Sequence, residues 1–295
     1  MDPDELLKVR ARYDAEVREG AQPDGADALV ERVGRVVRQS VPGLGWNGVL
    51  WSDLDEDTAD AQIAAQVAFF AERGCPDFEW KLYRHDRPAD LGDRLRAAGF
   101  VPEPPETLMV GRVAELAQLP VEPPQGITLR VVTDEAGVDL MMRVHAGAFG
   151  TERPRIREAL LSRLRDEPET VAAVVAMAGD TPVSAARMEM RPGTAFAGLW
   201  GGGTLPRWRG RGIYRLLVAH RARIAAELGI PYLQVDASDD SRPILERLGF
   251  GVMGVTVPYI WTRPQEPTPQ ESTPARQQGL PRLPRRGSAD GGGAA

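Results

Sequence analysis

The residues best suited to chemistry lie between positions 201 and 215. This stretch is Gly-Gly-Gly-Thr-Leu-Pro-Arg-Trp-Arg-Gly-Arg-Gly-Ile-Tyr-Arg, with four arginines within nine residues. Three successive glycines inside a strand are costly, and they indicate either a ligand close to the backbone or a bulge. Glycines 210 and 212 let the chain turn into a helix whose first amides point outward, where anions bind. A strand, a glycine-rich turn and a basic helix start together predict a phosphate site.

The elements that must position this stretch alternate over residues 127–263. Strands are predicted at 127–132, 170–178, 182–190, 194–205, 232–237 and 252–261, and helices at about 134–149, 153–165, 212–228 and 241–248. Gly179-Asp180 is a two-residue hairpin signal, and the helix over 212–228 ends before Gly229. Because strand-helix-strand crossovers are right-handed, the strands flanking that helix are expected to be parallel neighbours. The predicted fold class is α/β, with a mixed central sheet and helices on both faces.

Residues 1–112 repeat the second half of this plan. An offset of 150 residues aligns 46–51 with 196–201, and Leu-Arg-Ala-Ala-Gly-Phe at 95–100 with Leu-Glu-Arg-Leu-Gly-Phe at 245–250. We interpret this as a tandem duplication, with chance similarity between two common βαβ units as the alternative. The segment equivalent to the basic turn, 52–60, has five carboxylates and no basic residue. Since like charges repel, this lobe should not bind phosphates, and its acids are expected to cap a helix.

Composition divides the chain into four parts. Residues 119–126 include three prolines, which is typical of an extended linker. Residues 264–295 hold six prolines and five glycines with few large apolar side chains, so burial cannot repay the entropy of ordering them. The predicted organisation is a first lobe at 1–112, a linker at 113–126, a second lobe at 127–263 and a disordered tail at 264–295.

The motif Arg207-x-x-Gly210-x-Gly212 after a strand resembles the acyl-CoA pyrophosphate signature of the GNAT acetyltransferase superfamily. Residues 237–250, which end in Leu-Gly-Phe, resemble the family's segment from strand five to helix four. The resemblance covers about 127–263 and makes residues 1–112 a degenerate GNAT-like lobe. It implies an acyl-CoA N-acyltransferase-like fold. It also implies an N-acetyltransferase that takes acetyl-CoA as acyl donor and transfers the acyl group to a primary amine by direct attack.

The resemblance also assigns binding roles by position. In the family, the strand before the loop splays from the next strand, and its free backbone pairs with the pantetheine arm. The residues expected at pantetheine are Gly203, Thr204 and Leu205, and those expected at the pyrophosphate are Arg207, Arg209, Gly210, Arg211, Gly212, Ile213 and Tyr214.

The sequence departs from the family at the proton donor. Many members have a tyrosine four residues before the glycine of Leu-Gly-Phe, whereas this chain has Leu245, which cannot donate a proton. Tyr259 on the last strand is the predicted substitute, and Tyr214 is the alternative. The predicted base is Glu189; Asp236, His145 and a water relay stay open. The missing tyrosine also motivates a second hypothesis, a non-catalytic acyl-CoA-binding or regulatory module, and an interaction scaffold that binds no coenzyme A is a third.

Composition narrows the partners and the compartment. A net charge of −6 disfavours nucleic acid, and the apolar run 171–179 is about half of the ~20 residues that span a bilayer. Three histidines and one cysteine lack metal-ligand spacing, so no metal is expected. The single cysteine and the acidic N-terminus favour the cytoplasm. The expected acceptor is a small-molecule or peptide amine, and the sequence does not indicate the oligomeric state.

Overall fold

The computed structural model describes residues 1–25, 27–43, 45–150 and 154–264, and the chain from Met1 to Arg263 forms one compact unit. Its first elements are α1 (Pro3–Tyr13), the π-helix η1 (Asp14–Glu19), β1 (Leu29–Val33), β2 (Val36–Ser40), β3 (Gly48–Ser52), α2 (Ala59–Glu72), β4 (Asp77–Tyr83), α3 (Leu91–Ala97), β5 (Val101–Pro102), β6 (Glu106–Arg112) and α4 (Val113–Leu116). The remaining elements are β7 (Ile127–Val132), α5 (Glu135–Phe149), α6 (Pro154–Asp166), the 3-10 helix η2 (Pro168–Thr170), β8 (Val171–Ala178), β9 (Thr181–Met190), β10 (Phe196–Thr204), the 3-10 helix η3 (Pro206–Trp208), α7 (Ile213–Glu227), β11 (Tyr232–Ala237), α8 (Arg242–Arg247) and β12 (Gly251–Thr262).

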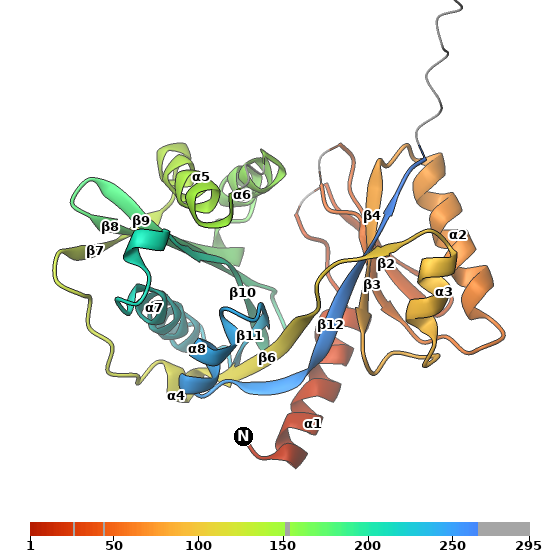
Figure 1. Ribbon diagram of the computed structural model, residues 1–295, viewed down its shortest axis with the longest axis horizontal. Helices are drawn as coiled ribbons and strands as arrows, with labels where there is room; N and C mark the ends of the chain where they lie inside the picture. The colour runs from red at the N-terminus through yellow and green to blue at the C-terminus, as the bar shows by residue number, and fades with distance from the viewer. Residues whose placement is uncertain (26, 44, 151–153, 265–295) are drawn as a thin grey trace, which may run out of the picture. The chain divides into compact units, whose positions relative to one another are not determined.

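One mixed sheet of 12 strands runs through both lobes (Figure 1). The strand order is β1-β2-β3-β4-β12-β6-β11-β10-β9-β8-β7, and β5 pairs with β12 outside this path. The predicted α/β class with a mixed sheet is therefore confirmed. Strands β10 and β11, which flank α7, are parallel, and so are β3 and β4, which flank α2. The βαβ plan predicted from the sequence is thus present in both lobes.

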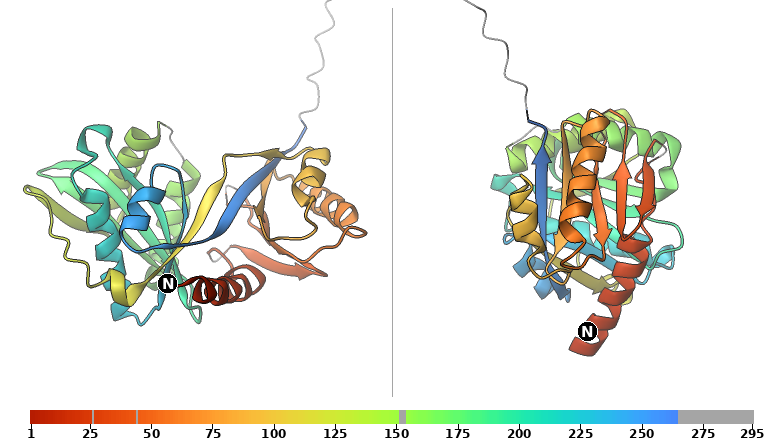
Figure 2. Two further views of the ribbon diagram at one scale, coloured as in Figure 1. Left: turned by 60° about the horizontal axis from the view of Figure 1, so that its bottom comes forward. Right: turned by 90° about the vertical axis from the view of Figure 1, so that its right-hand side faces the viewer.

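Helices cover both faces of the sheet (Figures 1 and 2). In the second lobe α7 and α8 pack on one face, in a cluster that includes Val218, Leu245 and Leu199. Helices α5 and α6 pack on strands β7 to β9 through residues such as Val144 and Leu160. In the first lobe α2 lies against the strands through Ile63 and Phe70. These apolar clusters hold the strands that carry the candidate site.

Two strands pair across the lobes, which the sequence did not predict. Strand β6, from the first lobe, lies between β11 and β12 and is antiparallel to both. Strand β12, from the second lobe, pairs with β6 over Gly251–Thr256 and with β4 over Thr256–Thr262. Leu108, Met109 and Val110 of β6 are fully buried, as expected for a central strand with both faces covered. The lobe boundaries at 112 and 127 stay predictions, and the predicted tail lies outside the described residues from 265 onward.

A buried ion pair joins η1 to the loop after β4. The Nη2 atom of Arg18 donates to both carboxylate oxygens of Asp86, each at 2.8 Å. The two side chains are each 4% exposed. The Arg18 guanidinium also lies 3.7 Å from the Tyr83 ring centroid and bonds Asp14 at 2.8 Å. Removing one partner of such a pair leaves an uncompensated buried charge.

Arg18→Met is therefore expected to lower the free energy of unfolding by about 3–5 kcal/mol, as measured by urea denaturation. Arg12→Met is the matched control, because the Arg12 and Glu16 pair is solvent-exposed and should contribute at most about 1 kcal/mol. Equal losses in the two variants would contradict a structural role for the Arg18 and Asp86 pair.

Candidate functional site

The turn between β10 and α7 leaves a helix start open. Gly210 and Gly212 have φ angles of +74° and +81°, in the left-handed region that favours glycine. Gly212 is the N-cap of α7, and no side chain caps this end. The first helical bond runs from the Leu216 amide to the Gly212 carbonyl at 3.0 Å, so the amides of residues 213–215 have no acceptor within the helix. These amides and the helix dipole form an anion site.

Exposed arginines surround this helix start. Arg207, Arg209, Arg211 and Arg215 are all exposed, and within the described ranges no carboxylate forms an ion pair with any of them. Arg209 instead donates to the carbonyls of Thr204 and Ala148, each at 3.2 Å. Arg211 lies over the Trp208 ring, 4.6 Å from its centroid. The positive charge of the turn is therefore uncompensated.

The three glycines of β10 contain a bulge. Trp200 pairs with Arg187 and Gly203 pairs with Ala185 of β9, so two residues of β10 oppose one residue of β9. The first of these two, Gly201, has a φ of +59°, which is the geometry of a glycine bulge. The bulge that the sequence left open as an explanation is thus present.

Side chains also approach these glycines closely. A Cβ on Gly202 would lie 2.8 Å from Cε2 of Tyr214, and a Cβ on Gly203 would lie 2.8 Å from Cε2 of Phe149. Helices α7 and α5 therefore pack closely against the bulge, one on each face of the sheet. Larger residues at 202 and 203 would push these helices away.

Strands β10 and β11 diverge just before the bulge. They pair at only three positions, the last being Gly198 with Gln234, although β10 continues to Thr204 and β11 to Ala237. On its other edge β11 pairs with β6 along its whole length. The facing edges of β10 and β11 are left without a strand partner, and such an edge can pair with an extended ligand. This is the splay that the resemblance implied.

The ten residues predicted to bind the cofactor lie together at this splay and turn. Thr204 Oγ1 lies 2.8 Å from Ser184 Oγ, and the Leu205 amide donates to the Val183 carbonyl at 2.9 Å, so β9 fixes the end of β10. Arg207 follows in η3, residues 209–212 form the open turn, and Ile213 and Tyr214 begin α7. Their binding roles remain predictions.

Leu245 is fully buried in the core under α8. The position that holds a tyrosine in many family members is therefore filled by packed hydrocarbon. Tyr214 on α7 is the tyrosine that lies against the bulge. Burial raises the pKa of Tyr214, so its hydroxyl keeps its proton through the neutral range.

Tyr259 lies elsewhere than expected. We expected the last strand to run beside the strand that follows α7, but β6 lies between β12 and β11. With strands ~4.8 Å apart, this places β12 roughly 10 Å from β11. Tyr259 packs in the first-lobe core beside Gly92, where a Cβ would lie 2.6 Å from its hydroxyl.

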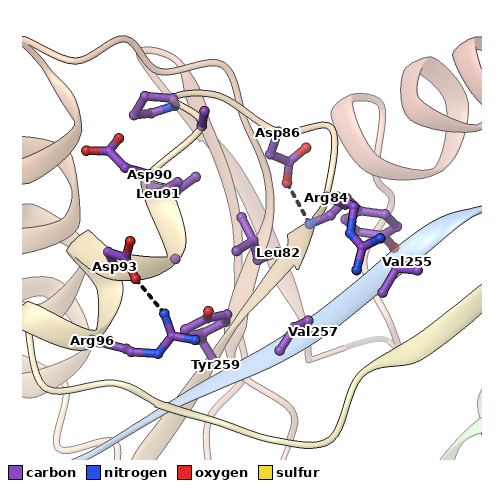
Figure 3. A pocket seen from close by; sticks show the side chains of 14 residues that line it. Leu82, Arg84, Asp86, Asp90, Leu91, Asp93, Arg96, Val255, Val257 and Tyr259 are labelled. Carbon is purple, nitrogen blue, oxygen red and sulfur yellow. Dashed lines mark hydrogen bonds and ion pairs between the residues drawn. The ribbon is translucent and has the colours of Figure 1, made fainter.

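Tyr259 also lines a pocket of about 240 Å³ in the first lobe (Figure 3). Val255, Val257 and Tyr259 share the face that lines it, as expected for side chains that alternate along a strand. Arg96, which pairs with Asp93 at 2.7 Å, lies over the Tyr259 ring with its guanidinium carbon 5.5 Å from the centroid. The role of Tyr259 as proton donor remains a prediction that this location does not favour.

Both carboxylate oxygens of the predicted base Glu189 are engaged. Oε1 accepts from Arg187 Nε at 2.6 Å, and Oε2 lies 3.0 Å from Arg163 Nη1. His145, another candidate, stacks beside Phe149 on α5 with 4.8 Å between ring centroids. Asp236 differs from Glu189, because its Oδ1 is buried and no other described residue hydrogen-bonds it.

Sequence reasoning missed the partner of Asp236. Lys81 Nζ lies 2.7 Å from Asp236 Oδ2 and 3.7 Å from Glu106 Oε2. Lys8 and Lys81 are the lysines of this arginine-rich chain. A lysine within a predicted strand was the one sequence feature that could have drawn attention to position 81. No local pattern predicts, however, that strand β4 lies close to β11.

The equivalent turn of the first lobe has the opposite charge. Arg35 bonds Asp53 at 2.8 Å and Asp55 at 2.7 Å. Asp55 also accepts from the Thr58 amide at 2.9 Å, just before α2 begins. No side chain of the described residues caps α2 itself, but the carboxylate of Asp55 bonds an amide directly before the helix, and the acidic surroundings disfavour an anion there.

Two further classes of feature were searched in the described residues. No group of three or more His, Cys, Asp or Glu side chains there has a geometry that could hold a metal ion. No helix in the same ranges is both long and apolar enough to cross a membrane.

Comparisons with known proteins agree with this geometry. The model of the Acetyltransferase (GNAT) family matches residues 138–250. A search of curated proteins finds no match. Among solved structures, a GCN5-related N-acetyltransferase from Kribbella flavida is similar with a TM-score of 0.61 and 18% identity, over 86% of this chain and 94% of that one.

Two further solved structures are similar over most of both chains. A tandem GNAT protein from the clavulanic acid biosynthesis pathway has a TM-score of 0.58 and 13% identity, over 90% of this chain and 97% of that one. A GCN5-related N-acetyltransferase from Sphaerobacter thermophilus has a TM-score of 0.53 and 14% identity, over 90% and 95%. At these identities the likeness shows the fold. Residues 138–250 thus belong to the GNAT family of acetyltransferases, and the chain has the GNAT fold with two tandem lobes.

Proposed function

We propose that this protein is an N-acetyltransferase that takes acetyl-CoA as acyl donor and acetylates a primary amine by direct attack. The observation that carries the proposal is the coincidence, in the second lobe, of an uncapped helix start, arginines without a carboxylate partner among the described residues and a splayed strand edge. The acceptor is a small-molecule or peptide amine. Cytoplasmic location is part of the proposal and rests on the single cysteine.

The donor's phosphates suit the turn at 209–214. Free amides at the start of α7 donate to phosphate oxygens, and the exposed arginines supply charge-assisted bonds. The pantetheine arm carries amide groups, which suit the unpaired backbone of β10 at Gly203 to Leu205. This arrangement directs the thioester toward the point where β10 and β11 diverge.

The transfer itself needs one bond made and one broken. The lone pair of the neutral amine attacks the thioester carbon, the C–N bond forms, and the C–S bond breaks with its electron pair leaving on sulfur. The thiolate then takes a proton, and the amide nitrogen loses one to solvent water. We propose Tyr214 as the donor of the proton to sulfur, because its ring lies against the bulge and a tyrosine hydroxyl is protonated at neutral pH.

A non-catalytic acyl-CoA-binding or regulatory module is the second candidate. The packed Leu245 favours it, since no hydroxyl is present where many relatives place the acid. Both candidates require coenzyme A binding, and they differ in turnover.

Calorimetry should find one coenzyme A per chain. Gly210→Glu is expected to abolish binding, because it puts a carboxylate beside the phosphates. Gly74→Glu is the matched control, since Gly74 has a similar φ of +76° and open space around it but lies in the first lobe. Two sites per chain, or equal binding by both variants, would refute a single site at this turn.

Purified protein is expected to release coenzyme A thiol from acetyl-CoA at a rate that depends on the amine supplied. A panel of polyamines, amino sugars, amino acids and peptides measures both catalysis and substrate class. Coenzyme A binding without release for any amine would favour the non-catalytic module. A chain that binds no coenzyme A would favour an interaction scaffold.

Tyr214→Phe is expected to lower kcat by at least tenfold, since general acids typically contribute about 10²–10⁴ in rate. Tyr259→Phe is the paired variant, and it should leave kcat unchanged because Tyr259 lies in the first-lobe core. Melting temperature and coenzyme A affinity serve as controls for both. The opposite ranking of the two variants would restore Tyr259 as the acid.

A further inference from the structure

A lysine of the first lobe reaches the transfer region of the second. Lys81 on β4 bonds Asp236 on β11 at 2.7 Å, and the two side chains are 15% and 3% exposed. Asp236 lies two residues past the last pair between β10 and β11. The pair thus stands at the mouth of the splay, where the proposed function puts the thioester.

Asp236 faces away from the helix that holds the phosphate turn. Its neighbours Val235 and Ala237 pack with α7 in the core, so strand alternation directs Asp236 to the opposite face of the sheet. The donor's phosphates sit at the start of α7, and an acceptor on the opposite face reaches the thioester without crossing the donor. Asp236 therefore occupies the acceptor side.

One oxygen of Asp236 keeps an unused capacity to accept a hydrogen bond. Lys81 holds Oδ2, whereas Oδ1 is buried and bonded by no other described residue. A buried polar atom without a partner destabilises the folded state. Trp200 completes the surroundings from β10, because its ring centroid lies 5.9 Å from Lys81 Nζ.

The charges near this oxygen favour a cation. Glu106 lies 3.7 Å from Lys81 Nζ, and Glu79, which accepts from Trp46 Nε1 at 2.9 Å, is close enough to raise the pKa of Lys81. Burial opposes this shift, but Asp236, Glu79 and Glu106 outweigh it and keep Lys81 charged. Three carboxylates around one ammonium give the region a net negative charge, which favours the binding of a second ammonium.

We infer that Asp236 Oδ1 binds the acceptor nitrogen and that Lys81 of the first lobe is the positioning residue that aims it. This assignment rests on the proposed function. Asp236 holds the amine as ammonium and also the positive charge that the nitrogen gains when it attacks the thioester carbon. The ammonium proton lost before attack goes to solvent water, and the carboxylate stays ionised throughout. The acceptor class is a primary amine that is cationic at neutral pH.

The test is steady-state kinetics with the most active cationic amine of the panel. Asp236→Asn and Lys81→Met are each expected to lower kcat/KM for the amine by about 10- to 100-fold, the worth of a hydrogen bond to a charged group. Coenzyme A affinity should hold in both. Asp239→Asn, which removes an exposed carboxylate on the next loop, and Lys8→Met, which removes an exposed lysine, are the matched controls.

A double-mutant cycle separates positioning from mere support of the fold. If Lys81 acts through Asp236, Lys81→Met adds little loss in the Asp236→Asn background. Lys81→Arg, which keeps the cation, should retain more activity than Lys81→Met. If Asp236→Asn does not fold, the comparison of Lys81→Arg with Lys81→Met decides whether the cation at position 81 is needed for activity.

Other outcomes overturn the assignment. Wild-type turnover with unchanged amine kcat/KM in a folded Asp236→Asn variant refutes it while the proposed function stands. Additive losses in the cycle refute the positioning role of Lys81. A wild-type protein that binds coenzyme A without turnover refutes the proposed function, and this assignment falls with it.

Discussion

The divergence of β10 from β11 after Gly198 is the constraint on which the rest of the site depends. Strand β6, which comes from the first lobe, pairs with the other edge of β11 along its whole length, so β11 is held on one side while its edge toward β10 opens. The bulge at Gly201 and the approach of Tyr214 lie where β10 continues without β11. The first lobe therefore fixes one of the two strands that border the splay, even though its own turn is acidic.

Electrostatics, more than backbone, separates the two lobes. Strands β3 and β4 also pair at only two positions, so the first lobe keeps a short parallel contact of the same kind. Its helix start, however, is preceded by Asp55, which bonds the Thr58 amide and Arg35. In the second lobe no carboxylate of the described residues bonds the equivalent amides. The same βαβ arrangement thus has carboxylates at the start of α2 and free amide donors at the start of α7.

Local signals explain which parts of this arrangement the sequence predicts. Strand β7 at 127–132 and strand β11 at 232–237 have the predicted bounds, and α7 differs by one residue at each end, because periodicity and glycine punctuation are local. Strand β6 has no such signal for its neighbours. Its position between β11 and β12 depends on pairing between residues more than 100 positions apart. The prediction that Tyr259 lies beside the strand after α7 was wrong for this reason, and the contact of Lys81 with Asp236 was missed for the same reason.

Two buried ion pairs in the first lobe and at its junction differ in a way that bears on function. Both oxygens of Asp86 are satisfied, by Arg18 and by the Tyr83 amide, and the atom of that pair without a partner is a donor, Arg18 Nε. In the other pair the atom without a partner is an acceptor, Asp236 Oδ1, although the side chain is 3% exposed. Well-packed apolar side chains often replace a buried pair without loss of stability, so burial by itself assigns a stabilising role to neither pair. An incompletely bonded carboxylate at the mouth of the splay is better explained by a group that binds there during turnover.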